Sequence, residues 1–167
     1  MLKRLLEGRD EKGFTLIELM VVVLIIGILI AIALPTFLGA RSRAQNRAAE
    51  SSLRNALVSA KTLYTDTDDY STANYTQLAV VEPSLTYNAA GTASTGPTNV
   101  SVYNNNNGTG SSNGQIWAAA ALSASNACFL IKDDSNGPGA TYGANATCTG
   151  TQANTSATAS TPSAGGW

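Results

Sequence analysis

Glu18 and the two cysteines are the residues whose type and position point most directly to chemistry in this chain. Glu18 follows Phe14-Thr15-Leu16-Ile17 and precedes a long apolar run. The 167-residue sequence contains no His, so it lacks the commonest general base and the commonest metal ligand. Two cysteines cannot supply a four-thiolate zinc site within one chain. The sequence therefore predicts no enzyme active site, no cofactor and no metal centre.

Glu18 requires a partner if it enters an apolar layer. The 22 residues from Leu19 to Ala40 are all uncharged. At ~1.5 Å per residue they form about 33 Å of helix, enough to cross a hydrocarbon core of ~30 Å. A carboxylate inside such a layer costs ~2.5–3.5 kcal/mol on insertion scales. Lys12 lies too far upstream to share a helical turn with Glu18, so the partner is expected from another chain or from an amine created by processing. The alternative is a position among headgroups, in contact with water.

The apolar run itself has two interpretations. A secretory signal peptide would also start with basic residues and could end at a small-residue site such as Ala31-Ile32-Ala33. However, a signal core needs only ~7–15 apolar residues, and the run here is longer, which favours a membrane anchor. Gly27 and Pro35 interrupt the run, and a membrane helix tolerates both residue types.

The segment Gly13-Phe14-Thr15-Leu16-Ile17-Glu18, followed by Leu19–Leu34 and Pro35, resembles the N-terminus of a type IV prepilin. The resemblance implies that prepilin peptidase cleaves between Gly13 and Phe14 and then N-methylates the new Phe14 amine. It also implies that Glu18 pairs with the Phe14 amine of a neighbouring subunit during assembly. The stretch from Gly27 to Pro35 matches the part of a pilin helix that loses helical structure in filaments. An ordinary kinked span is the alternative for that stretch.

Composition divides the chain into four segments. Residues 1–13 form the predicted leader, and residues 14–40 form the transmembrane and filament-core helix. Residues 41–66 carry apolar residues at spacings of three or four, which predicts that the helix continues as an amphipathic helix. Residues 67–167 form the predicted β head, in which 67–99 is a connection and 149–167 a low-complexity, mostly mobile tail. The fold class is α+β, a long N-terminal helix packed on a small antiparallel sheet as in type IV pilins.

Three strands and their turns are predicted in the head. The strand candidates are residues 100–103, 115–122 and 127–132, with turns at 104–114 and 133–138. The oxygen-rich turn containing Asp133, Asp134 and Asn136 could hold Ca²⁺, but it lacks the spacing of an EF-hand, and these are ordinary turn residues.

Cys128 and Cys148 are expected to form a disulfide, because the head would face an oxidising compartment and because pilins commonly close a C-terminal loop in this way. Two free thiols are the alternative. A redox-active pair is disfavoured, since the sequence has no CxxC spacing.

These features predict a structural subunit of a type IV pilus, inserted in the cytoplasmic membrane before assembly and then part of an extracellular filament. The expected partners are other copies in a helical homo-oligomer, prepilin peptidase, the pilus assembly machinery and the membrane. The formal net charge of −1 gives no broad basic surface, so nucleic acid is not expected as a partner. The alternatives are a type II secretion pseudopilin or a membrane-tethered binding protein that does not polymerise.

Overall fold

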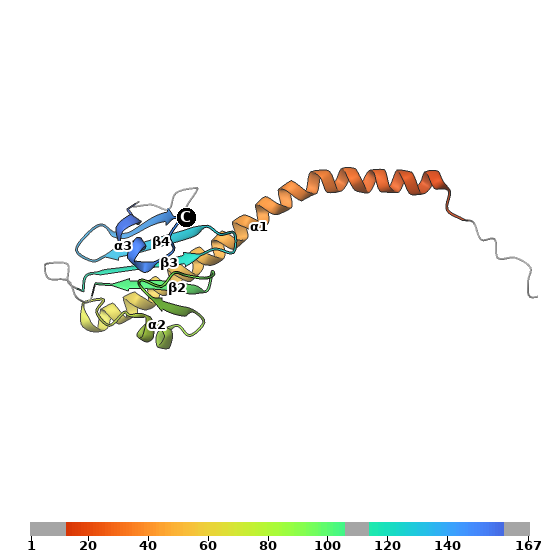
Figure 1. Cartoon of the computed structure of the whole chain (residues 1–167). Helices are drawn as coiled ribbons and strands as arrows, with labels where there is room; N and C mark the ends of the chain where they lie inside the picture. The colour runs from red at the N-terminus through yellow and green to blue at the C-terminus, as the bar shows by residue number, and fades with distance from the viewer. Residues whose placement is uncertain (1–12, 106–113, 159–167) are drawn as a thin grey trace, which may run out of the picture. The chain divides into compact units, whose positions relative to one another are not determined.

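The computed structural model describes residues 13–105 and 114–158, so leader residues 1–12 and tail residues 159–167 lie outside the described part. The chain divides into two compact units, residues 1–40 and 41–167, which are described separately below. The elements in chain order are α1 (Leu16–Thr67), α2 (Tyr75–Val81), β1 (Thr86–Ala89), β2 (Asn99–Asn104), β3 (Ile116–Leu122), β4 (Cys128–Asp134), β5 (Gly139–Asn145) and α3 (Gly150–Ser156) (Figure 1).

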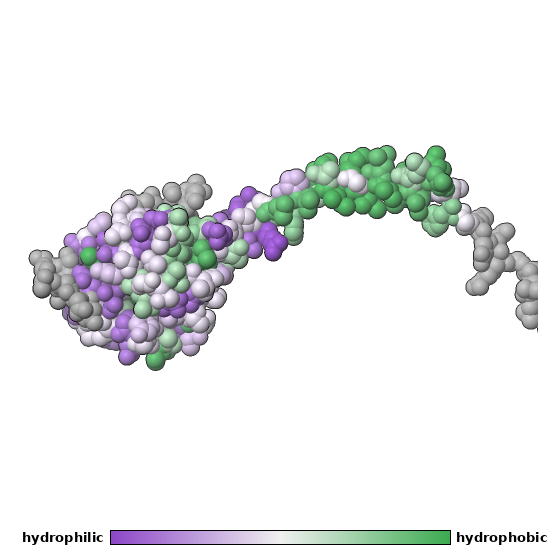
Figure 2. All heavy atoms as spheres, in the orientation of Figure 1, coloured by the Kyte–Doolittle hydropathy of each residue, from purple (hydrophilic) through white to green (hydrophobic). Residues whose placement is uncertain are grey.

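The first unit contains the apolar part of α1. Its large side chains from Leu16 to Leu38 are each between 47% and 76% exposed, and Figure 2 shows them as a continuous hydrophobic surface. The helix continues through Gly27 and Pro35 in the single chain. Near the proline, the hydroxyl of Thr36 donates to the carbonyl of Ala33 at 2.8 Å. The predicted loss of helix between Gly27 and Pro35 concerns the assembled filament and stays a prediction.

The second unit consists of three layers, with the sheet between the last part of α1 and the short helix α3 (Figure 1). Because its apolar residues recur every three or four positions, α1 turns one continuous face toward the sheet. The buried residues of that face are Ala49, Ser52, Leu53, Ala56, Leu57, Ser59 and Ala60. Small residues predominate, which allows the helix to lie close to the strands.

Successive side chains of the central strands point to opposite faces of the sheet, so each strand contributes residues to both faces. In β3, Trp117, Ala119 and Ala121 belong to the core on the α1 side. Ala118 and Ala120 belong to the smaller core under α3. The predicted strand at residues 115–122 is therefore confirmed as a strand buried on both faces, although its alanines have high helix propensity.

The sheet has the strand order β1-β2-β3-β4-β5 and is mixed rather than antiparallel. Neighbouring strands from β2 to β5 pair antiparallel, but β1 pairs parallel with β2, with Thr86 opposite Asn99. The prediction of an antiparallel sheet was wrong at this edge. Parallel pairing is possible with a short connection because β1 has only four residues, so residues 90–98 suffice to return the chain.

Side chains hold this return loop in place. The hydroxyl of Ser94 donates to the carbonyl of Asn99 at 2.5 Å, and the side-chain oxygen of Asn99 accepts from the amide of Thr95 at 3.0 Å. The amide side chains of Asn88 and Asn99 also bond to each other at 2.8 Å. The loop is thus stabilised by polar contacts that leave no hydrophobic pattern in the sequence.

Two further regions differ from the sequence-based expectations. The segment 67–99, expected to be a connection, contains α2 and β1, and residues 150–156 of the expected mobile tail form α3. Asn74 caps α2 by accepting from two backbone amides, and Thr149 caps α3 by accepting from Gln152. Both helices have only seven residues, so each depends on its cap and on a few buried residues rather than on a periodic apolar stripe.

Candidate functional site

The Gly13–Phe14 bond lies in non-helical backbone immediately before α1. Phe14 is 87% exposed, and a Cβ placed on Gly13 would meet no atom within 4 Å. A protease cleaves extended and accessible backbone most readily. The geometry of the junction is therefore compatible with the predicted cleavage between these two residues.

Thr15 and Glu18 form a reciprocal capping box at the start of α1. One Glu18 carboxylate oxygen accepts from the backbone N–H of Thr15 at 3.0 Å and from its hydroxyl at 2.7 Å. The backbone N–H of Glu18 in turn donates to the Thr15 hydroxyl oxygen at 3.2 Å. These bonds satisfy two N–H groups that the helix start would leave without partners, and they place a negative charge in the favourable first turn.

The capping box gives the Glu18 carboxylate an intrachain partner that the sequence argument overlooked. The signal was present, since Thr-x-x-Glu before an apolar run is the sequence pattern of this motif. Hydrogen bonds from neutral donors leave the negative charge of the carboxylate in place. Glu18 thus remains able to attract a cation, and its pairing with the Phe14 amine of another copy stays a prediction.

The side chain of Glu18 forms part of a shallow, mostly apolar hollow at the start of α1. The hollow is lined by Phe14, Ile17, Glu18, Val21 and Val22. Glu18 is exposed in the single chain, so the local dielectric constant falls, and attraction to an opposite charge strengthens, only when further apolar groups cover the hollow.

The exposed apolar surface of α1 is unfavourable in water, so we expect lipid or protein to cover it. By length and composition α1 could cross a membrane, although such a helix alone is weak support for a span. Soluble monomers rarely expose contiguous apolar patches larger than a few hundred Å². Lipid or other apolar helices are the environments that suit this part of α1.

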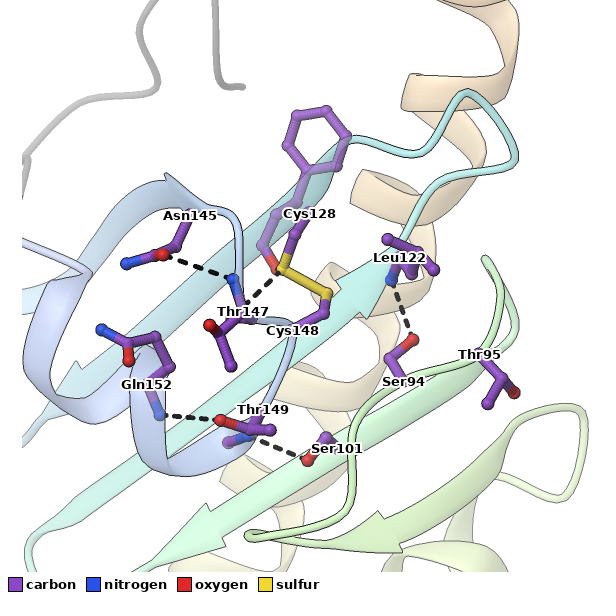
Figure 3. Close-up of a disulfide and its surroundings, with 12 residues drawn as sticks. Ser94, Thr95, Ser101, Leu122, Cys128, Asn145, Thr147, Cys148, Thr149 and Gln152 are labelled. Atoms are coloured by element: carbon purple, nitrogen blue, oxygen red, sulfur yellow. Dashed lines mark hydrogen bonds between the residues drawn. A yellow bond between two sulfur atoms is a disulfide. The ribbon is translucent and has the colours of Figure 1, made fainter.

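In the second unit, Cys128 and Cys148 form the expected disulfide (Figure 3). The two Cα atoms are 5.4 Å apart, and both residues are buried. The bond joins the start of β4 to the residue before the cap of α3, Thr149. It fixes a segment in which Gly150 approaches the backbone of β2 and donates its N–H to the hydroxyl of Ser101 at 2.9 Å.

A buried carboxylate joins the end of α1 to β4. Asp133 accepts from the hydroxyl of Tyr70 at 2.5 Å and pairs with the ammonium of Lys61 at 3.0 Å. Burial and the hydrogen bond to Asp133 raise the pKa of Tyr70 above its ordinary value. These three residues line a cleft together with Tyr64 and the β4–β5 turn at residues 134–139.

This arrangement also bears on the calcium alternative. Asp133 faces Tyr70 and Lys61, while Asp134 accepts from the backbone N–H of Asn136 at 3.1 Å. The turn residues are thus held by protein contacts. Across residues 13–105 and 114–158, no three His, Cys, Asp or Glu side chains gather as a metal site would require.

Comparison with known proteins gives the N-terminal site its family context. Residues 8–34 match the family described as the prokaryotic N-terminal methylation motif. The chain carries this methylation motif. The motif spans Gly13, Phe14 and Glu18 and ends one residue before Pro35.

Two relatives named as pilus components match part of this chain. A type IV major pilin protein, PilA of Myxococcus xanthus, is 45% identical over 61 residues, which is 36% of this chain and 28% of the relative. A type IV wide pilus major component, PilA4 of Thermus thermophilus, is 40% identical over 62 residues, 37% of this chain and 47% of the relative. The matches thus span less than half of either relative. No solved structure matches the chain.

These matches confirm the resemblance to type IV prepilins that the methylation motif indicated. They cover just over a third of the chain.

Proposed function

We propose that this chain is a structural subunit of a type IV pilus, matured by prepilin peptidase and polymerised through α1 into a surface filament. The observation that carries the proposal is the methylation motif placed at the accessible start of an exposed apolar helix. The pilin names of the two relatives support the same role. The role is structural rather than enzymatic.

Maturation changes the charge at the start of α1. Cleavage after Gly13 releases the α-amino group of Phe14, whose ordinary pKa of about 7.7–8.0 keeps it largely protonated at neutral pH. N-methylation retains a basic amine. Processing therefore converts a neutral peptide bond into a cation four residues before Glu18.

This cation is the proposed partner of Glu18 in a neighbouring copy. Opposite charges attract strongly in an apolar environment, whereas either charge alone is heavily penalised there. An incoming subunit gains by placing its Phe14 amine against a Glu18 that has only its capping box. The pair sets the register of addition more than it adds raw stability.

The apolar surface of α1 explains two successive locations. Before assembly, residues 14–40 span the cytoplasmic membrane, with the leader on the cytoplasmic side and the head outside. After extraction by the assembly machinery, the same side chains pack against those of other copies in the filament core. Because lipid is as apolar as the helix, the transfer gains little from the hydrophobic effect and depends on the machinery and on packing.

The pseudopilin alternative shares the processing and the membrane span but predicts a different location. The disulfide-closed head favours an exposed pilin, because such a bond stabilises a head that must persist outside the cell.

Intact mass measurement of protein sheared from the cell surface, with the membrane fraction alongside, tests the proposal. We expect a sheared species that begins at methylated Phe14 and is two hydrogens lighter for the Cys128–Cys148 bond. The same processed species confined to membranes would favour the pseudopilin. A chain that begins at Met1, or one cut after Ala33, would contradict both roles.

A further inference from the structure

Charged residues are segregated along α1 in the second unit. Arg43 and Arg47 lie near the start of this part of α1, whereas Asp66 lies in its last turn and Asp68 directly follows its last residue, Thr67. We call the first pair the cationic patch and the second pair the acidic patch. All four residues are exposed. Beyond α1, Lys132 is the one cation in the described part of the head.

Within the described residues, no member of either patch takes part in an ion pair. The ion pair found among residues 13–105 and 114–158 joins Lys61 to Asp133, and it involves no member of either patch. An unpaired charge on the surface is common, but two opposite clusters on one helix form a complementary set.

The acidic patch is not explained by the stability of α1. The carbonyl end of a helix carries partial negative charge, so a carboxylate in the last turn is unfavourable and a cation is favourable. The last turn of α1 has no basic residue and contains Asp66 instead. Asp66 therefore does not stabilise the end of α1, and a cation from outside the chain would make its position favourable.

The two patches lie on different sides of α1, about 100–140° apart around the helix axis. At 100° per residue, counted from Ala49 on the buried face, Arg43 and Arg47 lie about 120–160° to one side and Asp66 about 100° to the other. Along the axis, Asp66 lies 19 to 23 residues after the two arginines, which is about 29–35 Å. A parallel copy beside the first, shifted by about this distance and rotated about the axis of the assembly, would bring its acidic patch to the cationic patch of the first copy.

We propose that the cationic patch of one copy docks on the acidic patch of a second, parallel copy shifted along α1. The proposal rests on the proposed filament function. Because different surfaces of the two copies meet, the contact is heterologous and repeats without closing, as an open helical assembly requires. The shift exceeds the ~6 Å that four helical residues span, so this neighbour differs from the one paired through Glu18.

The test is a one-for-one charge swap in the full chain, produced in cells that assemble the filament. Arg47→Glu and Asp66→Arg are made singly and together, and Ala79→Glu on the exposed side of α2 is the matched control for an added acid. The readout is the amount of processed subunit in the sheared fraction relative to the membrane fraction. Asp66→Arg places a cation at the helix end, so it should not weaken α1.

We expect each single reversal to lower the sheared fraction by at least about fivefold, because like charges then meet at every repeat. The combined variant should recover to within about twofold of the parent, and Ala79→Glu should match the parent. Arg43→Glu together with Arg47→Glu should give the strongest loss.

Several outcomes would overturn the contact. Loss with Arg47→Glu but not with Asp66→Arg, without recovery in the combined variant, would assign the cationic patch to anionic lipid headgroups. Unchanged assembly in every variant, including the double arginine reversal, would also overturn it. If the parent chain forms no sheared filament, the proposed function itself fails, whereas an assembling parent with a failed swap refutes only this contact.

Discussion

The carboxylate of Glu18 accepts two hydrogen bonds from Thr15 at the first turn of α1, and the N–H of Glu18 donates back to the Thr15 hydroxyl. This reciprocal arrangement orders the start of the helix next to the Gly13–Phe14 bond. It also gives one residue two roles, since the Glu18 side chain is a helix cap within the chain and the proposed charge partner between chains. The two roles are separable by substitution.

Glu18→Gln keeps an oxygen that can accept from Thr15 but removes the negative charge. We expect normal membrane insertion and cleavage, with filament yield in the sheared fraction lowered at least about tenfold, because the Phe14 amine of the incoming copy would be buried without a counter-charge. Intact mass and the ratio of sheared to membrane protein measure this outcome.

Thr15→Val is the matched control, because it removes the capping hydroxyl and leaves the charge. It should weaken the first turn by about 0.5–2 kcal/mol and leave assembly largely intact. Assembly lost with Thr15→Val and kept with Glu18→Gln would show that capping, rather than charge, is the essential role.

The Cys128–Cys148 bond is expected to stabilise the head by about 3 kcal/mol, as the chain-entropy relation gives for a loop of this length. The double variant Cys128→Ser/Cys148→Ser should therefore unfold at a lower urea concentration in detergent micelles. Fluorescence of the fully buried Trp117 reports the transition, in a background where Trp167 is replaced by Phe. The parent treated with a reductant should shift by the same amount, and an unchanged urea midpoint in both would refute the prediction.

Gly150 is required because α3 lies directly against β2. A Cβ at this position would stand 2.6 Å from the backbone nitrogen of Tyr103 and 2.6 Å from the carbonyl carbon of Val102. Backbone atoms cannot yield as a flexible side chain can, so Gly150→Ala should cost about 1–3 kcal/mol of unfolding free energy. Gly91→Ala is the control, since no atom lies within 4 Å of its Cβ position. Urea unfolding should separate the two variants, and equal midpoints would count against the close packing of α3.

The head should lose stability above about pH 10. Burial raises the pKa of Tyr70, aided by Asp133, and burial likewise raises the pKa of Tyr87. Above the ordinary tyrosine pKa of about 10, the unfolded chain releases both protons while the folded head retains them, so unfolding becomes more favourable as the pH rises. The free energy of unfolding should fall by up to about 1.4 kcal/mol per pH unit for each tyrosine.

Urea unfolding at pH 8, 9.5 and 11 measures this dependence. Tyr70→Phe combined with Tyr87→Phe should flatten it, whereas Tyr75→Phe, at a position that is 45% exposed, should not. An alkaline loss that persists in the double variant would assign the effect to other groups.

The sequence by itself determined the features that depend on strong local patterns. The uncharged run from Leu19 to Ala40 and the three-and-four spacing of residues 41–66 predicted a long helix, and α1 spans Leu16–Thr67. Strands β3 and β4 were predicted from runs of apolar residues and β2 from its alternating valines, and the spacing of Cys128 and Cys148 was consistent with the disulfide observed. The N-terminal motif was recognisable because its residues are contiguous, although its Thr15–Glu18 capping box was overlooked.

Only the tertiary structure decided the edges of the head. β1, α2 and α3 have only four to seven residues, and β5 consists mainly of small and polar residues, so their hydrophobic patterns are too weak to distinguish them from loops. β5 forms because β4 offers it a full ladder of partners, and α3 forms because Ala153 and Ala157 fill the outer face of the sheet. The parallel β1–β2 pair likewise depends on polar contacts between residues that only the fold brings together. The spacing of apolar residues indicates which face of a segment is buried and which is exposed to water. These elements instead form because a partner distant in the sequence satisfies their backbone hydrogen bonds.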